Sequence, residues 1–221
     1  MNDMTAIQKL FRADMLRKSR FHDQKGNLVD FRGWIYLPLA YGTVALRFLG
    51  WRPGVPWISY RARKVIDQMI RPDCRMVEFG SGMSTLWFAK RCGFVHSIES
   101  DPAWFDLVSK HLARLSNVRY EKRTIESYAN LDDHPDQSLD FCLIHGAVRS
   151  ACSRSVVPKI KRGGFIYLDN SDNDMTIPNG DARLAEHTLV NAAKERGGTI
   201  RYFVDFVPCN GAPTEGMLVR L

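Results

Sequence analysis

The chain has 221 residues, of which 45% are hydrophobic and 25% charged, with 31 Lys and Arg against 24 Asp and Glu. This length fits one domain with a short appendage, and the composition excludes disordered and collagen-like chains. The net charge of +7 permits contact with nucleic acid, anionic lipid or acidic substrates but selects none of them. The five cysteines lack zinc-site spacing, which argues against a disulfide scaffold and favours a reducing, cytoplasmic location.

The first part of the chain, residues 1–56, shows no regular alternation of strands and helices, and we expect a helical extension or cap there. Residues 7–18 carry a weak helical stripe, and residues 50–57 (GWRPGVPW) are typical of a linker. Between them, Gly33–Leu46 is uncharged but shorter than the about 20 residues that a membrane-spanning helix needs. We expect a packed segment, a homodimer contact or a peripheral membrane contact at this segment.

From residue 57 to residue 221, apolar runs alternate with helical segments. The predicted strands are Arg75–Phe79, Phe94–Ile98, Val118–Lys122, Leu139–Ile144, Phe165–Leu168, Ile200–Val207 and Gly216–Leu221. The predicted helices are Tyr60–Met69, Ser84–Arg91, Pro102–Leu115, 150–160 and Ala182–Arg196. The alternation implies right-handed crossovers and therefore an α/β fold with a doubly wound, mainly parallel sheet of seven strands. The last two strands lie close in sequence, so we expect the final strand to be antiparallel.

The most informative segment is VEFGSGMST (Val77–Thr85), which leaves a strand and enters a helix. Gly80 and Gly82 allow a tight turn and a close approach of the backbone to a ligand. Glu99 follows the next strand about 20 residues later, where an acidic side chain can accept both ribose hydroxyls of a nucleoside.

Two nucleoside cofactors compete for this arrangement. A nicotinamide dinucleotide favours the pattern G-x-G-x-x-G, which places a pyrophosphate on a helix N-terminus, but the sixth position here is Thr85. Glu78, just before the turn, is poorly placed beside a pyrophosphate and well placed beside a cation. S-adenosylmethionine carries a cationic sulfonium and a cationic amino group. The segment therefore favours S-adenosylmethionine over the cofactor of a nicotinamide-dependent oxidoreductase.

The motifs VEFGSGMSTLWFA, SIESD, DFCLIHG and GGFIYLDNSD together resemble the class I S-adenosylmethionine-dependent methyltransferases, in particular small bacterial O-methyltransferases. The resemblance covers about residues 57–221 and implies a Rossmann-like domain. It implies that the Gly80–Gly82 turn cradles the methionine part, that Glu78 lies near the amino group and that Glu99 holds the ribose. The residues that it assigns to the cofactor are Glu78, Gly80, Ser81, Gly82, Ser84, Thr85, Glu99 and Ser100.

The candidates for catalysis follow strands four and five. In cation-dependent O-methyltransferases, which the chain resembles here, an Asp after strand four and an Asp-Asn pair after strand five hold a metal. This chain keeps Asp169 and Asn170 but has His145 in place of the first acid. The loss of one carboxylate weakens a site for a hard cation, and His145 can instead act as a general base, as a ligand for a transition metal or as a structural residue. Arg149 is a candidate contact for an anionic substrate group.

These residues predict an S-adenosylmethionine-dependent methyltransferase that acts on oxygen of a small-molecule or saccharide acceptor and releases S-adenosylhomocysteine. A non-catalytic, nucleoside-binding partner subunit of the same fold is the alternative. A nucleic-acid substrate is disfavoured, because the basic clusters lack interleaved aromatic residues and HGAVR follows strand four in place of a base-stacking motif. We further expect that Gly80→Arg abolishes cofactor binding with little loss of fold. The other histidines suggest no pairing: His22, His96, His111, His134 and His187.

Overall fold

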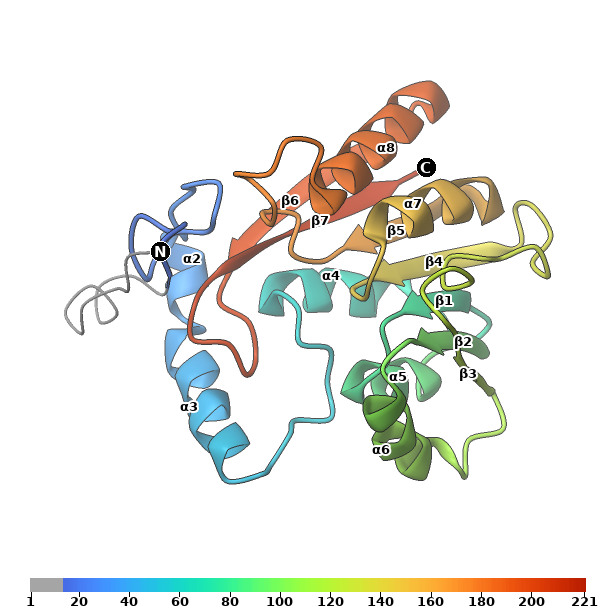
Figure 1. The fold of residues 1–221 in the computed structure, drawn as a ribbon, viewed down its shortest axis with the longest axis horizontal. Helices are drawn as coiled ribbons and strands as arrows, with labels where there is room; N and C mark the ends of the chain where they lie inside the picture. The colour runs from blue at the N-terminus through green and yellow to red at the C-terminus, as the bar shows by residue number, and fades with distance from the viewer. Residues whose placement is uncertain (1–13) are drawn as a thin grey trace.

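A computed structural model describes residues 14–221 as a seven-stranded sheet with helices on both faces (Figure 1). The strand order is β3-β2-β1-β4-β5-β7-β6, and β7 runs antiparallel to both of its neighbours. The strands are β1 (Arg75–Phe79), β2 (Phe94–Glu99), β3 (Val118–Lys122), β4 (Leu139–Ile144), β5 (Ile160–Leu168), β6 (Thr199–Asp205) and β7 (Thr214–Arg220). The helices are α2 (Phe31–Trp34), α3 (Leu37–Phe48), α4 (Tyr60–Met69), α5 (Met83–Ala89), α6 (Pro102–Leu112), α7 (Arg149–Val156), the 3₁₀ turn η1 (Val157–Lys159) and α8 (Asp181–Arg196).

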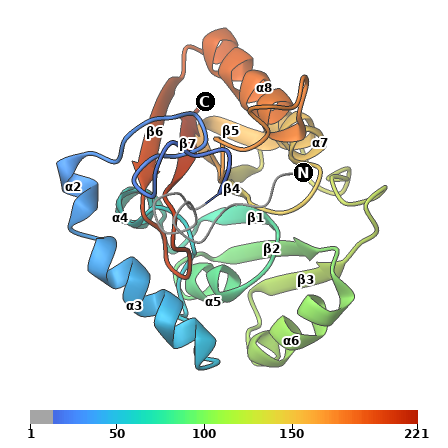
Figure 2. The ribbon, with the colours of Figure 1, turned by 60° about the vertical axis from the view of Figure 1, so that its left-hand side comes forward.

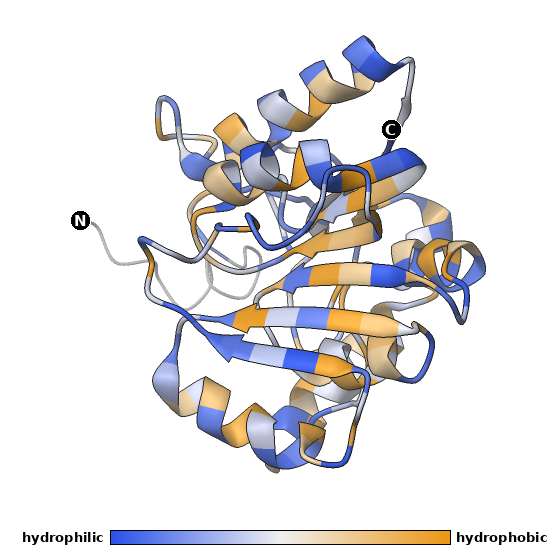
Figure 3. Cartoon of the chain, turned by 90° about the vertical axis from the view of Figure 1, so that its right-hand side faces the viewer, coloured by the Kyte–Doolittle hydropathy of each residue, from blue (hydrophilic) through white to orange (hydrophobic). Residues whose placement is uncertain are grey.

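The sheet separates two apolar cores. Successive side chains of a strand point to opposite faces, so β1 contributes Val77 and Phe79 to the core under α7 and α8, and Met76 to the core under α4 and α5. Figure 3 shows the apolar residues along the central strands, which are buried on both sides. Glu78 shares a strand face with Met76, and its carboxylate is therefore directed toward α5.

The α/β class, the mainly parallel sheet and the antiparallel final strand are confirmed. Helix α4 has the predicted bounds, and the other elements from residue 57 onward agree with the prediction to within a few residues, except β5. This strand begins at Ile160 and not at Phe165, so residues that we expected to connect a helix to a strand lie inside the sheet. Gly163 has a φ of +79°, and the pairing with β4 shifts register beside Leu139. An irregular strand of this kind lacks the uninterrupted apolar run that reveals a strand in a sequence.

The described part of the N-terminal extension packs near β5–β7. Lys25 Nζ lies 2.5 Å from Glu215 Oε1 and 2.7 Å from Glu186 Oε1, and the backbone N–H of Gln24 donates to Asp172. Helices α2 and α3 then lie at the periphery of the molecule (Figure 2). The predicted stripe at residues 7–18 falls mostly outside the described residues, and residues 14–18 are not helical. The division into two units near residue 56 stays a prediction.

All five cysteines are buried free thiols: Cys74, Cys92, Cys142, Cys152 and Cys209. Within residues 14–221, every helix is too short or too polar to cross a lipid bilayer. Neither finding identifies a cellular compartment, and the cytoplasmic location stays a prediction.

Candidate functional site

The turn after β1 is built on a contact between two glycines. Gly80 has a φ of +95°, and a Cβ at this position would lie 2.7 Å from the backbone nitrogen of Gly146 in the loop after β4. The N–H of Gly146 donates to the carbonyl of Phe79 at 2.7 Å, which holds the two loops together. Gly80 is thus required by the approach of a neighbouring backbone as well as by its own conformation. The structure does not support the expectation that Gly80→Arg spares the fold, because the arginine would collide with the β4 loop.

Gly82 serves the turn in a different way. Its φ of 171° is extended, and a Cβ would meet nothing nearer than 3.7 Å, where Ser84 and Trp104 lie. Its N–H donates to Thr85 Oγ1 at 3.1 Å, and the Thr85 hydroxyl donates to Glu78 Oε2 at 2.5 Å. One threonine hydroxyl therefore connects the start of α5 to the carboxylate of β1.

Glu78 is fully buried at this turn. Its Oε2 accepts hydrogen bonds from Thr85 and Ser97, whereas its Oε1 has no hydrogen-bond partner. Burial is the largest influence and raises the pKa of Glu78 above its usual value, against the lowering effect of the neighbouring hydroxyls. A cation within reach of Oε1 would supply the missing partner and favour the ionised carboxylate. The orphaned oxygen therefore suits a cationic ligand.

Glu99 lies at the end of β2, 7% exposed, and is surrounded by donors. Its Oε2 accepts from the backbone N–H and the hydroxyl of Ser81, and its Oε1 accepts from the N–H groups of Ser100 and Asp101. The Ser81 hydroxyl also contacts Tyr120 Oη at 2.7 Å. Ser81 and Ser100 are thus drawn toward Glu99, and a ribose would compete with the Ser81 hydroxyl for this carboxylate.

A pocket of about 110 Å³ lies beside this turn. Trp104 covers one side of it, and its indole N–H donates to the carbonyl of Ser81 at 2.7 Å. The remaining lining residues are Trp57, Ser81, Gly82, Met83, Ser84 and His145. The pocket is smaller than the about 300–1,000 Å³ typical of ligand sites. A larger cavity of about 380 Å³ lies at the opposite end of the strands, next to Arg71 and Lys161, and contains none of the predicted site residues.

His145 and Asp169 meet across the ends of β4 and β5. The distance from His145 Nδ1 to Asp169 Oδ2 is 3.1 Å, and the side chain of His145 is 34% exposed whereas that of Asp169 is 3% exposed. Burial lowers the pKa of His145, but the hydrogen bond and charge of Asp169 outweigh it, and the net shift is upward. Since His145 also lines the pocket, its ring stands where a ligand proton can reach it.

Arg149 joins the two loops through their backbones. Its guanidinium donates to the carbonyls of His145, Gly146 and Asp169, at 3.0 to 3.3 Å. These bonds point to a positioning role, and a direct contact with an anionic substrate stays a prediction. Asn170 lies next to Asp169 with a φ of +49°, in the left-handed region that Asn tolerates better than most residues.

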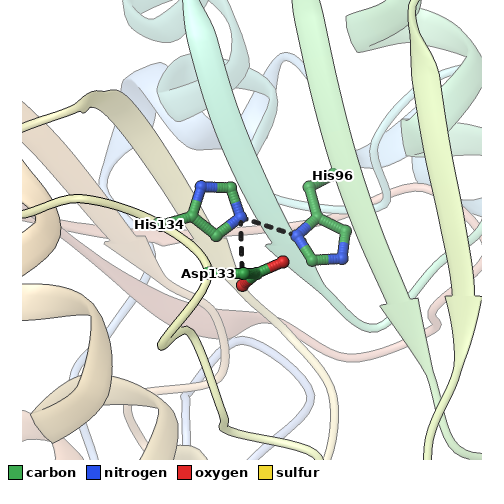
Figure 4. A group of neighbouring side chains, drawn as sticks. All are labelled: His96, Asp133 and His134. Atoms are coloured by element: carbon green, nitrogen blue, oxygen red, sulfur yellow. Dashed lines mark hydrogen bonds and ion pairs between the residues drawn. The ribbon is translucent and has the colours of Figure 1, made fainter.

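Two other histidines, which do not line the pocket, form a pair (Figure 4). His96 on β2 and His134 in the loop before β4 are buried, and their ring nitrogens are 2.8 Å apart. Burial lowers the pKa of His96 to about 4. With Asp133 they could surround a metal ion, but Arg119 already forms an ion pair with Asp133 and its charge opposes a second cation. The expectation that these two histidines have no pairing is wrong, because the loop after β3 brings together residues distant in sequence.

Ser97 and Trp104 are among the residues of the site that sequence reasoning missed. Ser97 donates to Glu78 from the neighbouring strand, and Trp104 closes the pocket from the first turn of α6. Ser97 has a signal, because it is a polar residue in the otherwise mostly apolar run of β2. Trp104 has a weaker one, its place just after the Asp101 helix cap.

No family model and no curated protein matches the chain. Several solved structures are similar to the chain. An O-methyltransferase from Bacillus cereus, in complex with S-adenosylhomocysteine, has a TM-score of 0.59 and 16% identity over 85% of this chain and 90% of that one. A putative caffeoyl-CoA O-methyltransferase from Staphylococcus aureus has a TM-score of 0.58 and 17% identity over 86% and 99%.

A third similar structure is that of a methyltransferase named for a different kind of acceptor. Precorrin-6y C5,15-methyltransferase from Geobacter metallireducens has a TM-score of 0.53 and 17% identity over 72% of this chain and 85% of that one. Its presence beside O-methyltransferases shows that the shared fold does not determine the acceptor. The structural likeness, together with the strand order, shows that this chain has the fold of the class I S-adenosylmethionine-dependent methyltransferases.

Proposed function

We propose that the chain is an S-adenosylmethionine-dependent methyltransferase that methylates a hydroxyl oxygen of a small-molecule or saccharide acceptor. The observation that carries this proposal is the unpartnered Oε1 of Glu78, a fully buried carboxylate oxygen beside the Gly80–Gly82 turn. A cationic amino group would donate a charge-assisted hydrogen bond to this oxygen, which is about twice as strong as the bond that a neutral donor would make.

The residues of the turn would hold the cofactor. Glu78 binds the amino group, Gly82 leaves the pocket side of the turn open, and Glu99 binds the ribose once the Ser81 hydroxyl yields. When bound, S-adenosylmethionine supplies an electrophilic methyl group on a positively charged sulfur. Because the pocket of about 110 Å³ is too small for the whole nucleoside, the Trp104 indole shifts from the Ser81 carbonyl on binding.

His145 acts on the acceptor. Asp169 accepts a hydrogen bond from His145 Nδ1, which leaves Nε2 unprotonated and able to take the proton of the acceptor hydroxyl. Asp169 positions the ring and stabilises the imidazolium that results. The pair offers one carboxylate and one imidazole, whereas magnesium prefers oxygen ligands, so this donor set does not fit a magnesium site. We therefore assign the proton to His145 without a metal.

The choice of oxygen has two supports. A hydroxyl must lose its proton during transfer, and His145 provides a base at the pocket. Two of the similar structures are also described as O-methyltransferases. The alternative, a non-catalytic nucleoside-binding subunit, is favoured by one observation, the small pocket under Trp104.

The test has two stages that separate these functions. Calorimetry with S-adenosylhomocysteine should show binding to the wild-type protein and none to Glu78→Ala, with His145→Ala as the control that retains binding. Labelled S-adenosylmethionine is then incubated with a pool of hydroxylated metabolites and sugars, and products are identified by mass spectrometry. Absence of binding contradicts the cofactor assignment. Binding without transfer to any acceptor supports the non-catalytic alternative.

A further inference from the structure

Helix α3 is apolar around its circumference yet largely uncovered. Its sequence is LPLAYGTVALRF, and Ala40 is the single buried residue among these twelve. A helix that is hydrophobic on all sides is normally enclosed by protein or lipid. Between Phe31 and Trp51, six large apolar side chains are more than half exposed, and we name them the α2–α3 face. They are Phe31, Ile35, Leu39, Phe48, Leu49 and Trp51.

Three side chains of this face are the most exposed large apolar side chains in the described part of the chain. Phe48 is 87% exposed, Leu49 81% and Phe31 77%. Single exposed apolar residues need no explanation, but six of them between Phe31 and Trp51 indicate an interaction site. Figures 1 and 2 show α2 and α3 at the periphery of the molecule, apart from the helices that cover the sheet.

Most charges around this face are positive, and the one carboxylate that caps α2, Asp30, is paired with Arg61. No Asp or Glu occurs between Phe31 and Ile66. Arg32, Arg47 and Arg52 are interspersed with the apolar residues, and all three are exposed, with Arg47 also donating to the carbonyl of Cys209. A partner for this face must therefore offer apolar surface and negative charge together.

We propose that the α2–α3 face docks on the surface of an anionic lipid membrane. Acyl chains cover the apolar side chains, and lipid phosphates neutralise the arginines. A second copy of the chain is a poorer occupant. In a symmetric dimer the same patch faces itself, so the arginines would oppose arginines, and the carboxylate beside the patch, Asp30, is already paired with Arg61.

The geometry makes this an interfacial contact. Helix α3 has twelve residues and is too short to cross a bilayer, so it lies in the headgroup region. The arginines also connect the face to the pocket: Arg47 lies 5.5 Å over the Trp57 ring and Arg52 lies 5.7 Å over the Trp104 ring. Docking therefore brings the mouth of the pocket close to the lipid headgroups.

The experiment measures binding of the full chain to vesicles. Vesicles of phosphatidylcholine mixed with phosphatidylglycerol should co-sediment the wild-type protein, and pure phosphatidylcholine vesicles should bind it much less. The double variant Phe48→Glu/Leu49→Glu should lose detectable binding. Arg32→Gln should bind about fivefold more weakly, the effect of about one basic residue near an anionic surface. Added salt should weaken binding in the same direction.

Ile177→Glu/Leu184→Glu is the matched control, because it introduces the same two negative charges at residues outside the α2–α3 face that are 56% and 39% exposed. It should bind vesicles as the wild-type protein does. Circular dichroism of each variant establishes that it is folded. Absence of wild-type binding to anionic vesicles overturns the proposal, as does equal binding by the Phe48/Leu49 variant. The wild-type protein could instead sediment as a dimer and not bind vesicles, while the Phe48/Leu49 variant sediments as a monomer. That result would assign the face to self-association. None of these readouts depends on methyl transfer.

Discussion

The pocket beside β1 and the α2–α3 face depart from the usual pattern of a folded chain in opposite ways, since one buries polar groups and the other exposes apolar ones. Beside the pocket, the carboxylates of Glu78, Glu99 and Asp169 are buried, and four of their six oxygens accept hydrogen bonds. The exceptions are single carboxylate oxygens of Glu78 and Asp169. At the α2–α3 face, apolar side chains such as Phe48 are exposed. Each region departs from the ordinary pattern of a folded chain at the point where a partner is missing. The two kinds of departure indicate two kinds of partner, a small cation at the first and an apolar, anionic surface at the second.

The largest expected effect concerns the two glycines of the turn. Gly80→Ala should destabilise the fold by about 3 kcal/mol or more, because a left-handed backbone conformation and a collision with Gly146 both oppose a Cβ. Gly82→Ala should unfold near the wild-type temperature, since its Cβ makes only ordinary contacts, and should weaken S-adenosylhomocysteine binding. Thermal unfolding and calorimetry measure the two effects. An unchanged melting temperature for Gly80→Ala would show that the turn is not built on this contact.

The next effect concerns the imidazole. His145→Gln should lower kcat by about 10²–10⁴-fold with unchanged cofactor affinity, because it removes the base. The rate should fall as pH decreases through the pKa of His145, which lies above the ordinary 6.5. Asp169→Asn removes the group that raises this pKa, so the acidic limb of the pH–rate profile should move to lower pH while the plateau falls. A limb that stays in place would contradict a positioning role for Asp169.

The charge of Glu78 should act on binding and stability in opposite directions. Glu78→Gln should weaken cofactor binding by about 10–100-fold, the value of a charge-assisted hydrogen bond. Because the folded state raises the pKa of Glu78, the ionised carboxylate destabilises the fold at neutral pH, and the amide should raise the melting temperature by a few degrees. For the same reason, wild-type stability should rise and cofactor affinity should fall as the pH decreases toward this pKa. Calorimetry and thermal unfolding across pH test both. If Glu78→Gln lowered both the cofactor affinity and the melting temperature, the carboxylate would be purely structural.

The smallest effect concerns Trp104. Its indole should leave the Ser81 carbonyl when the cofactor binds, so S-adenosylhomocysteine should change the tryptophan emission. Trp104→Phe should keep the affinity within about one order of magnitude, since a single neutral hydrogen bond contributes about 1 kcal/mol, and should lose most of the emission change. Trp51→Phe, on the α2–α3 face, is the matched control that retains it. Equal emission changes in both variants would place the response elsewhere.

The sequence predicted the Rossmann-like domain well because its signals are local. Alternating apolar strands and amphipathic helices, such as α4, can be recognised within a window of ten residues. The turn at Gly80 and Gly82 was equally visible. The role of Gly80 was not, because the atom that excludes a side chain belongs to Gly146, in another loop. The pairing of His96 with His134 escaped for the same reason, since it depends on where the chain returns after β3.

The N-terminal extension was the least predictable part of the chain. Helix α3 is apolar on every side, so it shows none of the one-sided periodicity by which a helix is recognised beside a protein core. The lack of a pattern is itself informative once the structure is known, because it agrees with a helix that contacts this chain's own core mainly through Ala40 and Leu37.

Arg149 gives the two catalytic loops a shared support. One guanidinium fastens the backbone after β4 to the backbone after β5. The imidazole of His145 and the carboxylate of Asp169 therefore rest on two backbones whose separation is fixed by a single arginine side chain.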